Sequence, residues 1–277
     1  MKRLFVACAA VALFLVSAAQ ASAGTLLLYA DQGIGNGSSR GLYNFDTSTG
    51  TATLRTTVSG VNDRVFGLEV RNSDGQLFGV GENGGLYRVD ANTGVFTQIS
   101  ATRAQLLAFA INPISGQAYV TGNNSVLQSI DLTTGALNTI GNMGGVDRGL
   151  VFFASGQMYG FDQLNSNLYL VNPSNASTML VGGSGPAVIV EDSTFDASGS
   201  LFLSDFGGKI DQVDPNTGAR TTVSTFVGPS GYLGLSTIPS PTATPEPASL
   251  TMLSIGALGI AGYSWHRRRR VMGVRGA

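Results

Sequence analysis

Three glutamates of the central region, residues 24–238, have side chains that could perform acid–base chemistry: Glu69, Glu82 and Glu191. Two carboxyl groups about 5 to 10 Å apart can hydrolyse a glycosidic bond, one as acid and the other as base or nucleophile. Such a separation has to be shown in space, and most aspartates already have a turn role. We therefore predict no catalytic residue, and a glycosidase-like hydrolase is the alternative.

The central region lacks the side chains that most other catalytic and metal sites need. The only cysteine is Cys8 and the only histidine is His266, and both lie near the chain ends. This excludes a thiol nucleophile, a Ser-His-Asp triad and a Cys or His metal site. Gly33, Gly35 and Gly37 resemble a phosphate cradle, but no helical pattern follows, so we interpret them as a loop. No cofactor and no metal ion are predicted.

The charges are unevenly distributed along the 277 residues, of which 12% are charged. Seven of the 16 Lys and Arg residues lie at the two ends, which leaves nine in the central region against 16 acidic residues. The central region is therefore acidic by about seven charges, and such a surface repels phosphates. We predict no binding to nucleic acid. The 43% hydrophobic content and 38 glycines fit one globular domain rich in turns.

An Asp-x-x-Thr-Gly motif returns along the chain and sets its organisation. The Asp side chain can accept backbone N–H bonds two residues on, and Gly takes the left-handed conformation that ends a short hairpin loop. The predicted turn residues are Asp46, Gly50, Asp90, Gly94, Asp131, Gly135, Asp214 and Gly218, with Asn172 and Ala176 in the fourth repeat. A calcium loop is the competing interpretation, but its other spaced oxygen ligands and closing Glu are missing.

The repeat has the period of propeller blades. The Asp or Asn positions are spaced by 44, 41, 41 and 42 residues. Each turn lies between two strand-like runs and is preceded by a hairpin, so that one repeat has four antiparallel strands. In the second repeat these are residues 66–71, 77–81, 85–90 and 95–99. Other first strands are predicted at residues 106–111, 149–153 and 193–195.

The first repeat lacks a first strand after residue 23, and the chain end can supply it. Residues 231–236 resemble residues 65–69 in composition and placement. We therefore predict an all-β, five-bladed β-propeller over residues 24–238, whose first blade is closed by the C-terminal strand. Closure of this kind leaves no open sheet edge.

Residues 1–23 have the pattern of a secretory signal peptide. Lys2 and Arg3 precede an apolar run, and small residues at Ala21 and Ala23 mark the cleavage site. The expected partner is the secretion translocon. A buried or membrane-spanning helix is the alternative interpretation of this segment.

The C-terminal segment changes composition abruptly. Residues 239–247 form a Pro-rich linker, and residues 248–266 form an apolar run long enough to cross a bilayer as one transmembrane helix. Residues 267–277 are a basic cytoplasmic tail, in which Arg267, Arg268, Arg269 and Arg270 set the orientation in the inner membrane.

This order of parts resembles the PEP-CTERM protein-sorting signal of Gram-negative bacteria. The matching residues are Pro245, Glu246 and Pro247, the apolar run after them, and the arginine cluster. The resemblance implies recognition and cleavage by an exosortase, then release or display of the central region at the cell surface. It also implies a link to the exopolysaccharide matrix. A simple C-terminal anchor is the alternative.

Three functions follow as hypotheses. The first is a non-enzymatic surface propeller that binds a carbohydrate, such as an exopolysaccharide, or a surface protein. The second is an enzyme, either the glycosidase-like hydrolase or a quinone-dependent dehydrogenase, although quinone propellers have a repeated Trp that the central region lacks. The third is a purely structural matrix component.

Overall fold

A computed structural model describes residues 24–31, 40–101, 104–183, 187–226 and 233–238. The predicted signal peptide with Ala21 and Ala23, the linker with the sorting motif, the apolar run and the basic tail lie outside these residues. Within the described part of the chain, no helix is long and apolar enough to span a membrane.

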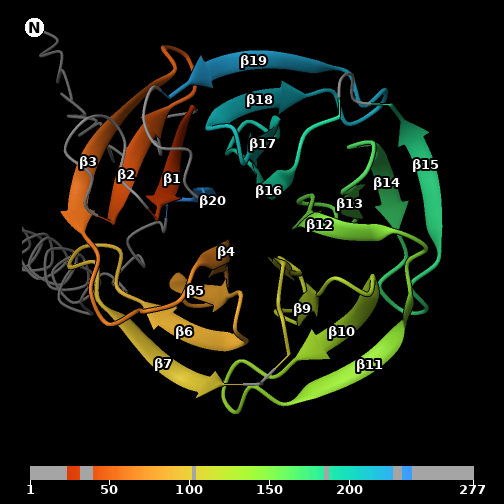
Figure 1. Ribbon diagram of the computed structural model, residues 1–277, viewed down its shortest axis with the longest axis horizontal. Helices are drawn as coiled ribbons and strands as arrows, with labels where there is room; N and C mark the ends of the chain where they lie inside the picture. The colour runs from red at the N-terminus through yellow and green to blue at the C-terminus, as the bar shows by residue number, and fades with distance from the viewer. Residues whose placement is uncertain (1–23, 32–39, 102–103, 184–186, 227–232, 239–277) are drawn as a thin grey trace, which may run out of the picture.

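The fold is a ring of five four-stranded antiparallel sheets around a central axis (Figure 1). Blade 1 contains β20 (Leu233–Thr237), β1 (Thr25–Ala30), β2 (Gly41–Asp46) and β3 (Thr51–Thr57). Blade 2 contains β4 (Val65–Arg71), β5 (Gln76–Gly81), β6 (Gly85–Val89) and β7 (Phe96–Ala101). Blade 3 contains β8 (Ala108–Ile111), β9 (Ala118–Thr121), β10 (Val126–Ile130) and β11 (Leu137–Asn142).

The remaining two blades follow the same order from the axis outward. Blade 4 contains β12 (Val146–Phe152), β13 (Met158–Asp162), β14 (Leu168–Val171) and β15 (Thr178–Gly182). Blade 5 contains β16 (Val190–Phe195), β17 (Leu201–Asp205), β18 (Lys209–Val213) and β19 (Arg220–Thr225). The predicted five-bladed propeller is confirmed.

The first blade is closed by both ends of the central region, as predicted. Strand β20 pairs antiparallel with β1, and Leu27 lies opposite Ser236 while Ala30 lies opposite Leu233. Without β20, the inner edge of β1 would present unpaired N–H and C=O groups to the axis. The C-terminal strand therefore joins the last part of the fold to its first strand.

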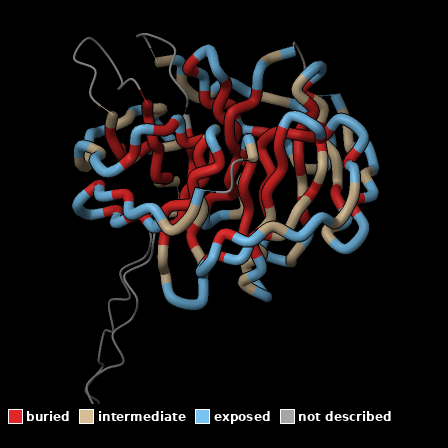
Figure 2. The backbone as a smooth tube through the Cα atoms, turned by 60° about the horizontal axis from the view of Figure 1, so that its bottom comes forward, coloured by how far each residue is buried: buried red, intermediate tan, exposed pale blue. Residues whose placement is uncertain are grey.

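The strands of the inner half of each blade are buried because neighbouring blades cover both of their faces. Strand β12 is buried at every residue, whereas the outer strand β15 is half-buried to exposed. Figure 2 shows the buried segments gathered in the interior and the exposed ones at the periphery. The apolar core is divided among the blade interfaces, where Tyr29 of blade 1, for example, packs on Phe96 of blade 2. This packing explains why the strands are apolar on both faces.

Because each blade is antiparallel, its turns divide between two faces of the ring. The Asp-turns and the hairpins that follow the inner strands lie on one face, which we call the turn face. The loops after the second strands and the connections between blades lie on the opposite face.

Two inner strands begin three residues earlier than the sequence predicted. Strand β12 begins at Val146 and β16 begins at Val190, whereas the predicted starts were residues 149 and 193. The added residues include charged side chains, which the apolar pattern had placed outside the strands. Strand β8 begins later, at Ala108, and β20 is shifted to Leu233–Thr237.

Candidate functional site

β-Bulges at the start of three inner strands turn side chains out of the regular pairing. Phe66 of β4, Asp147 of β12 and Glu191 of β16 each lie at a register shift and have no paired residue on the second strand. A bulge leaves one residue unpaired and re-aims its side chain. The same device therefore occurs at equivalent positions of blades 2, 4 and 5.

Asp192 ties three blades together at the axis. Its Oδ2 accepts the backbone N–H of Leu68 at 3.2 Å and that of Leu235 at 2.9 Å, and Oδ1 accepts the N–H of Ser193. The residue is fully buried, and this burial raises the pKa of its carboxyl well above the ordinary value, against the lowering effect of these donors. Asp192 thus occupies the middle of the channel between the inner strands.

Arg148 and Glu191 form a buried charged group on the face opposite the turns. They are 6% and 1% exposed, and the guanidinium of Arg148 lies over the Phe66 ring at 5.4 Å. Among the described residues, no hydrogen-bond partner reaches Nε or Nη1 of Arg148 or Oε2 of Glu191. Burial raises the pKa of Glu191 to about 8, although the positive charge of Arg148 lowers it. We call this end of the channel the charged end.

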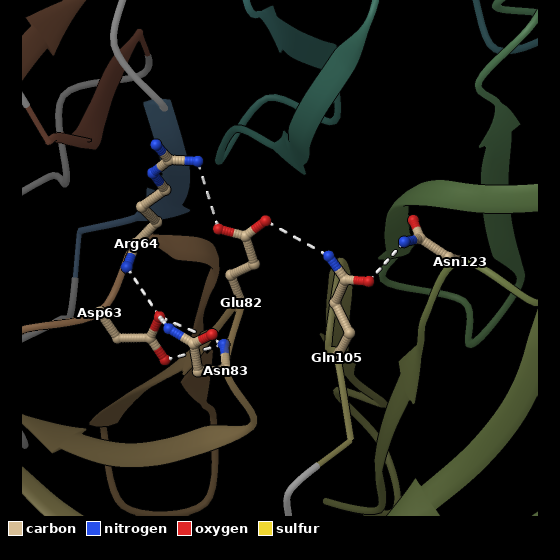
Figure 3. A network of polar contacts seen from close by, with 6 residues as sticks. All are labelled: Asp63, Arg64, Glu82, Asn83, Gln105 and Asn123. Atoms are coloured by element: carbon tan, nitrogen blue, oxygen red, sulfur yellow. Dashed lines mark hydrogen bonds and ion pairs between the residues drawn. The ribbon is translucent and has the colours of Figure 1, made fainter.

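A chain of polar contacts continues the charged end across blades 2 and 3 (Figure 3). Glu82 accepts hydrogen bonds from Arg64 Nη1 at 3.4 Å and from Gln105 Nε2 at 3.3 Å. The Asn123 amide donates in turn to the side-chain oxygen of Gln105. Each of these residues lies in a loop next to a strand, so the strands of the blades fix the positions of the polar groups.

Asp63 fixes the loop that presents Glu82. Its carboxylate accepts hydrogen bonds from the backbone N–H of Arg64 and from the backbone and side-chain amides of Asn83 (Figure 3). The loop between β5 and β6 is thereby joined to the segment before β4. Glu82 is therefore positioned by its neighbours on both sides.

The opposite end of the channel is a cavity of about 380 Å³, which we call the axial pocket. All five blades contribute to its lining, from the ends of their inner strands and the hairpins that follow. The aromatic wall contains Phe152, Phe153 and Phe195, of which the last two make an edge-to-face contact at 4.9 Å. Glu69 is the charged residue of blade 2 in this lining.

The Glu69 carboxyl has a buried oxygen that no hydrogen bond or ion pair within the described part of the chain satisfies. Among the described residues, Oε2 of Glu69 has no hydrogen-bond partner, and burial raises the pKa of the group to about 8. Its negative charge would also act on Asp192 deeper in the channel, whose pKa it raises. A buried carboxyl at the wall of an apolar pocket is a feature of binding sites.

The three glutamates considered for the alternative hydrolase are thus divided between the two ends. Glu82 and Glu191 share the charged end, where the charge of Glu82 contributes to the raised pKa of Glu191, whereas Glu69 lines the axial pocket. Sequence reasoning missed Arg148 and Asp192. The signal that could have found them is a charged residue inside an otherwise apolar inner strand.

The predicted turn residues lie in Asp-turns on the turn face. Oδ1 of Asp46 accepts the N–H of Ser48 at 2.8 Å, and Gly50 has a φ of 68°. The other turns repeat this geometry, with Oδ1 bonded two residues on in Asp90, Asp131, Asn172 and Asp214, and a positive φ at Gly94, Gly135, Ala176 and Gly218. These aspartate oxygens are satisfied by the backbone, and the described residues contain no cluster of three metal-ligating side chains.

Each turn also packs on the outer strand of the preceding blade. A Cβ on Gly94 would lie 2.0 Å from the carbonyl oxygen of Thr57, and one on Gly50 would lie 2.5 Å from that of Val223. The fourth turn has Ala176, and there the facing residue of β11 is Gly141, whose own Cβ would lie 3.1 Å from that of Ala176. Glycine is therefore needed at these contacts for space as well as for φ.

A larger groove of about 820 Å³ on the turn face lies between blades 1 and 2. Arg55 in its lining donates from Nε to the carbonyl oxygen of Ala91 and from Nη2 to Asn92, both at 2.7 Å. These bonds join β3 to the Asp-turn of blade 2. Arg55 in this groove therefore serves the packing of the two blades.

Comparison with known proteins agrees with this architecture. Among solved structures, a chain in the crystal structure of a nidogen/laminin complex is similar with a TM-score of 0.54 and 16% identity, over 77% of this chain and 82% of that one. A structural genomics protein of unknown function from Bacteroides thetaiotaomicron has a TM-score of 0.47 and 15% identity, over 70% and 53%. The first similarity supports the fold alone, and nothing is inferred from the second. The chain is a β-propeller protein.

Two family models match parts of the sequence. Residues 41–116 match a domain of unknown function (DUF4394), and residues 243–270 match the PEP-CTERM protein-sorting motif. No curated protein matches the sequence. The predicted PEP-CTERM signal is confirmed, and with it the chain is a propeller protein that carries an exosortase-sorting motif.

Proposed function

We propose that the chain is an exported precursor that an exosortase cuts near Pro245-Glu246-Pro247, and that its propeller binds a carbohydrate or protein partner without catalysis. The observation that carries this proposal is the sorting motif over residues 243–270. The processed propeller is displayed at the cell surface or released into the matrix. The inner membrane holds the precursor until the cut.

The propeller supports a binding role because both ends of its channel hold groups that a ligand could satisfy. The axial pocket combines an aromatic wall with a few polar groups, as ligand sites do. The charged end contains buried polar atoms that no described residue satisfies. Unpaired buried groups are destabilising, and a partner that pairs them gains the corresponding free energy.

Binding to the matrix tests this proposal. The protein recovered from the culture medium is mixed with isolated exopolysaccharide and with a glycan array, and a precursor lacking the last 33 residues is the control for sorting. We expect the mature propeller to be retained by the matrix fraction whichever C-terminus it carries. Retention only of the form that still has the apolar segment would contradict a binding propeller and favour membrane anchoring.

A glycosidase-like hydrolase is the second candidate, because Glu82 and Glu191 lie at the same end of the channel. Glu191, with its raised pKa of about 8, would be the acid, and the more exposed Glu82 the second carboxylate. Release of reducing sugar from matrix polysaccharide measures this activity. We expect none; activity that disappears in both Glu82→Gln and Glu191→Gln would replace the binding proposal with an enzyme.

A further inference from the structure

The axial pocket contains a carboxyl group that the described part of its lining does not pair. Glu69 and Asp196 line it, and none of the described residues of its lining is basic. Oδ1 of Asp196 already accepts hydrogen bonds from the backbone N–H groups of Ser198 and Ser200. Glu69 is therefore the group of the pocket that lacks a counter-charge and a donor.

The rest of the lining suits a compact cation. The aromatic side chains of Phe152, Phe153 and Phe195 present π systems that attract cations, and apolar side chains such as Val151 and Ile111 exclude water from the wall. A volume of about 380 Å³ accommodates a lysine side chain or one sugar residue. The lining also contains the polar residues Thr194, which is buried, and Asn72, which is exposed.

We propose that the axial pocket binds a primary ammonium group, carried by an amino sugar or by a lysine side chain, through an ion pair with Glu69. The ammonium donates to the carboxylate that no described residue satisfies, while the aromatic wall surrounds the carbon atoms next to the nitrogen. This inference deepens the proposed binding function and rests on it, because it names the chemistry of the ligand.

The ion pair links binding to a proton. In the free protein burial raises the pKa of Glu69 to about 8, so the group is protonated at neutral pH, and an ammonium in the pocket favours the ionised form. Binding therefore releases a proton. The affinity for a lysine analogue rises with pH by at most about tenfold per unit below the pKa of the free group.

The other carboxyls near Glu69 belong to neighbouring inner strands and turns. Asp192 of β16 is bonded to three backbone N–H groups, and Asp196 is held in its turn. Arg71, at the end of β4, is paired with Asp74 and lies over Phe78. These groups already have hydrogen-bond or ion-pair partners, so we expect Glu69 to be the group whose protonation changes on binding.

Calorimetry on the exported, full-length mature protein tests the inference. The probes are Nα-acetyl-lysine methylamide and glucosamine, and the matched neutral probes are the Nε-acetylated lysine analogue and N-acetylglucosamine. We expect one ammonium probe to bind at least tenfold tighter than its acetylated form, with proton release measured in two buffers of different ionisation enthalpy. The arm that binds identifies the source of the ammonium.

Three variants complete the test. Glu69→Gln should lose the binding at least tenfold and abolish proton release, whereas Glu191→Gln, at the other end of the channel, should bind within twofold of the wild type. Asn72→Lys, on the exposed rim, should weaken binding by placing a cation of the protein at the pocket, without a change in the core. Thermal unfolding confirms that each variant is folded.

Several outcomes overturn the inference. Equal affinity for the charged and the acetylated probes, or an unchanged affinity of the Glu69→Gln variant, would show that binding involves no ion pair with Glu69. If no ammonium probe binds but the Glu69→Gln variant is still retained by the matrix fraction, the inference is wrong while the proposed binding function stands. If the wild-type protein binds neither the matrix fraction nor any probe, both the inference and the proposed binding function are wrong.

Discussion

Buried carboxyl groups determine how this propeller responds to pH. Glu191 is 1% exposed, and burial raises its pKa from the ordinary 4.5 to about 8. Between these values the folded protein keeps the proton that the unfolded chain loses. The folded state then binds more protons, so the free energy of unfolding decreases as the pH rises through this window.

We predict that Glu191→Gln reduces this loss of stability. Relative to the wild type, the variant should gain in free energy of unfolding between pH 5 and pH 8.5, because the amide carries no charge to bury. Urea unfolding at the two pH values measures the difference. Asp46→Asn is the control: hydrogen bonds from Ser48 lower the pKa of Asp46, so its carboxyl is ionised in both states above pH 5 and its effect should be constant. A pH-independent effect of Glu191→Gln would contradict the prediction.

At the residue scale, the sequence predicted side chains whose partners are close in the chain. Asp46 and Gly50 form a turn with bonds that span two to four residues, so the local motif was sufficient. Asp192 accepts a hydrogen bond from Leu68, which is 124 residues away, and its position depends on a bulge at Glu191. No local pattern contains that information.

The Asp-turn is the element that joins one blade to the next. Its glycine has a positive φ, and in four of the five turns it also lies against the outer strand of the preceding blade. The positive φ was predictable from the Thr-Gly sequence. The contact between blades was not, because it depends on how the blades are tilted against one another.

We predict that Gly94→Ala destabilises the protein more than Gly116→Ala. Both glycines have a φ of 72°, but a Cβ at Gly116 meets nothing within 4 Å, whereas one at Gly94 meets the Thr57 carbonyl oxygen at 2.0 Å. The φ strain alone lowers the free energy of unfolding by about 1–2 kcal/mol, and the clash raises the loss at Gly94 to about 2–5 kcal/mol. Equal losses in urea unfolding would show that the contact between blades is unimportant.

The closing strand makes a second prediction at the element scale. Leu235 of β20 is fully buried against the first blade, so Leu235→Ala should lower the free energy of unfolding by about 2–5 kcal/mol. The matched control is Leu180→Ala on β15, where the side chain is 56% exposed and the expected change is within about 0.5 kcal/mol. If urea unfolding shows the two variants to be alike, β20 does not contribute to the ring as described.

At the scale of the whole molecule, the number of blades and their closure were predictable because the motif repeats at nearly constant spacing. The charged end and the axial pocket were not predictable, since each assembles residues from several blades. Glu69 and Glu82 lie only 13 residues apart in sequence, yet one lines the axial pocket and the other lies at the charged end. The inner strand β4 and its return strand β5 separate them.

The sorting motif makes a prediction for the whole molecule. Replacing Pro245, Glu246 and Pro247 by alanine should leave an uncut precursor in the membrane fraction, because the exosortase no longer recognises it. Pro241→Ala, in the same linker, is the control and should be processed normally. Immunoblots of the membrane and medium fractions measure both forms; normal processing of the triple variant would contradict recognition through this motif.

The intact mass of the protein recovered from outside the cell tests the central claim most directly, because one number reports both processing steps. The account predicts a single species that begins near residue 22 or 24 and lacks the apolar segment and arginine cluster that follow the Pro-Glu-Pro motif. Recovery of the unprocessed 277-residue chain from the cytoplasm would contradict export and sorting together.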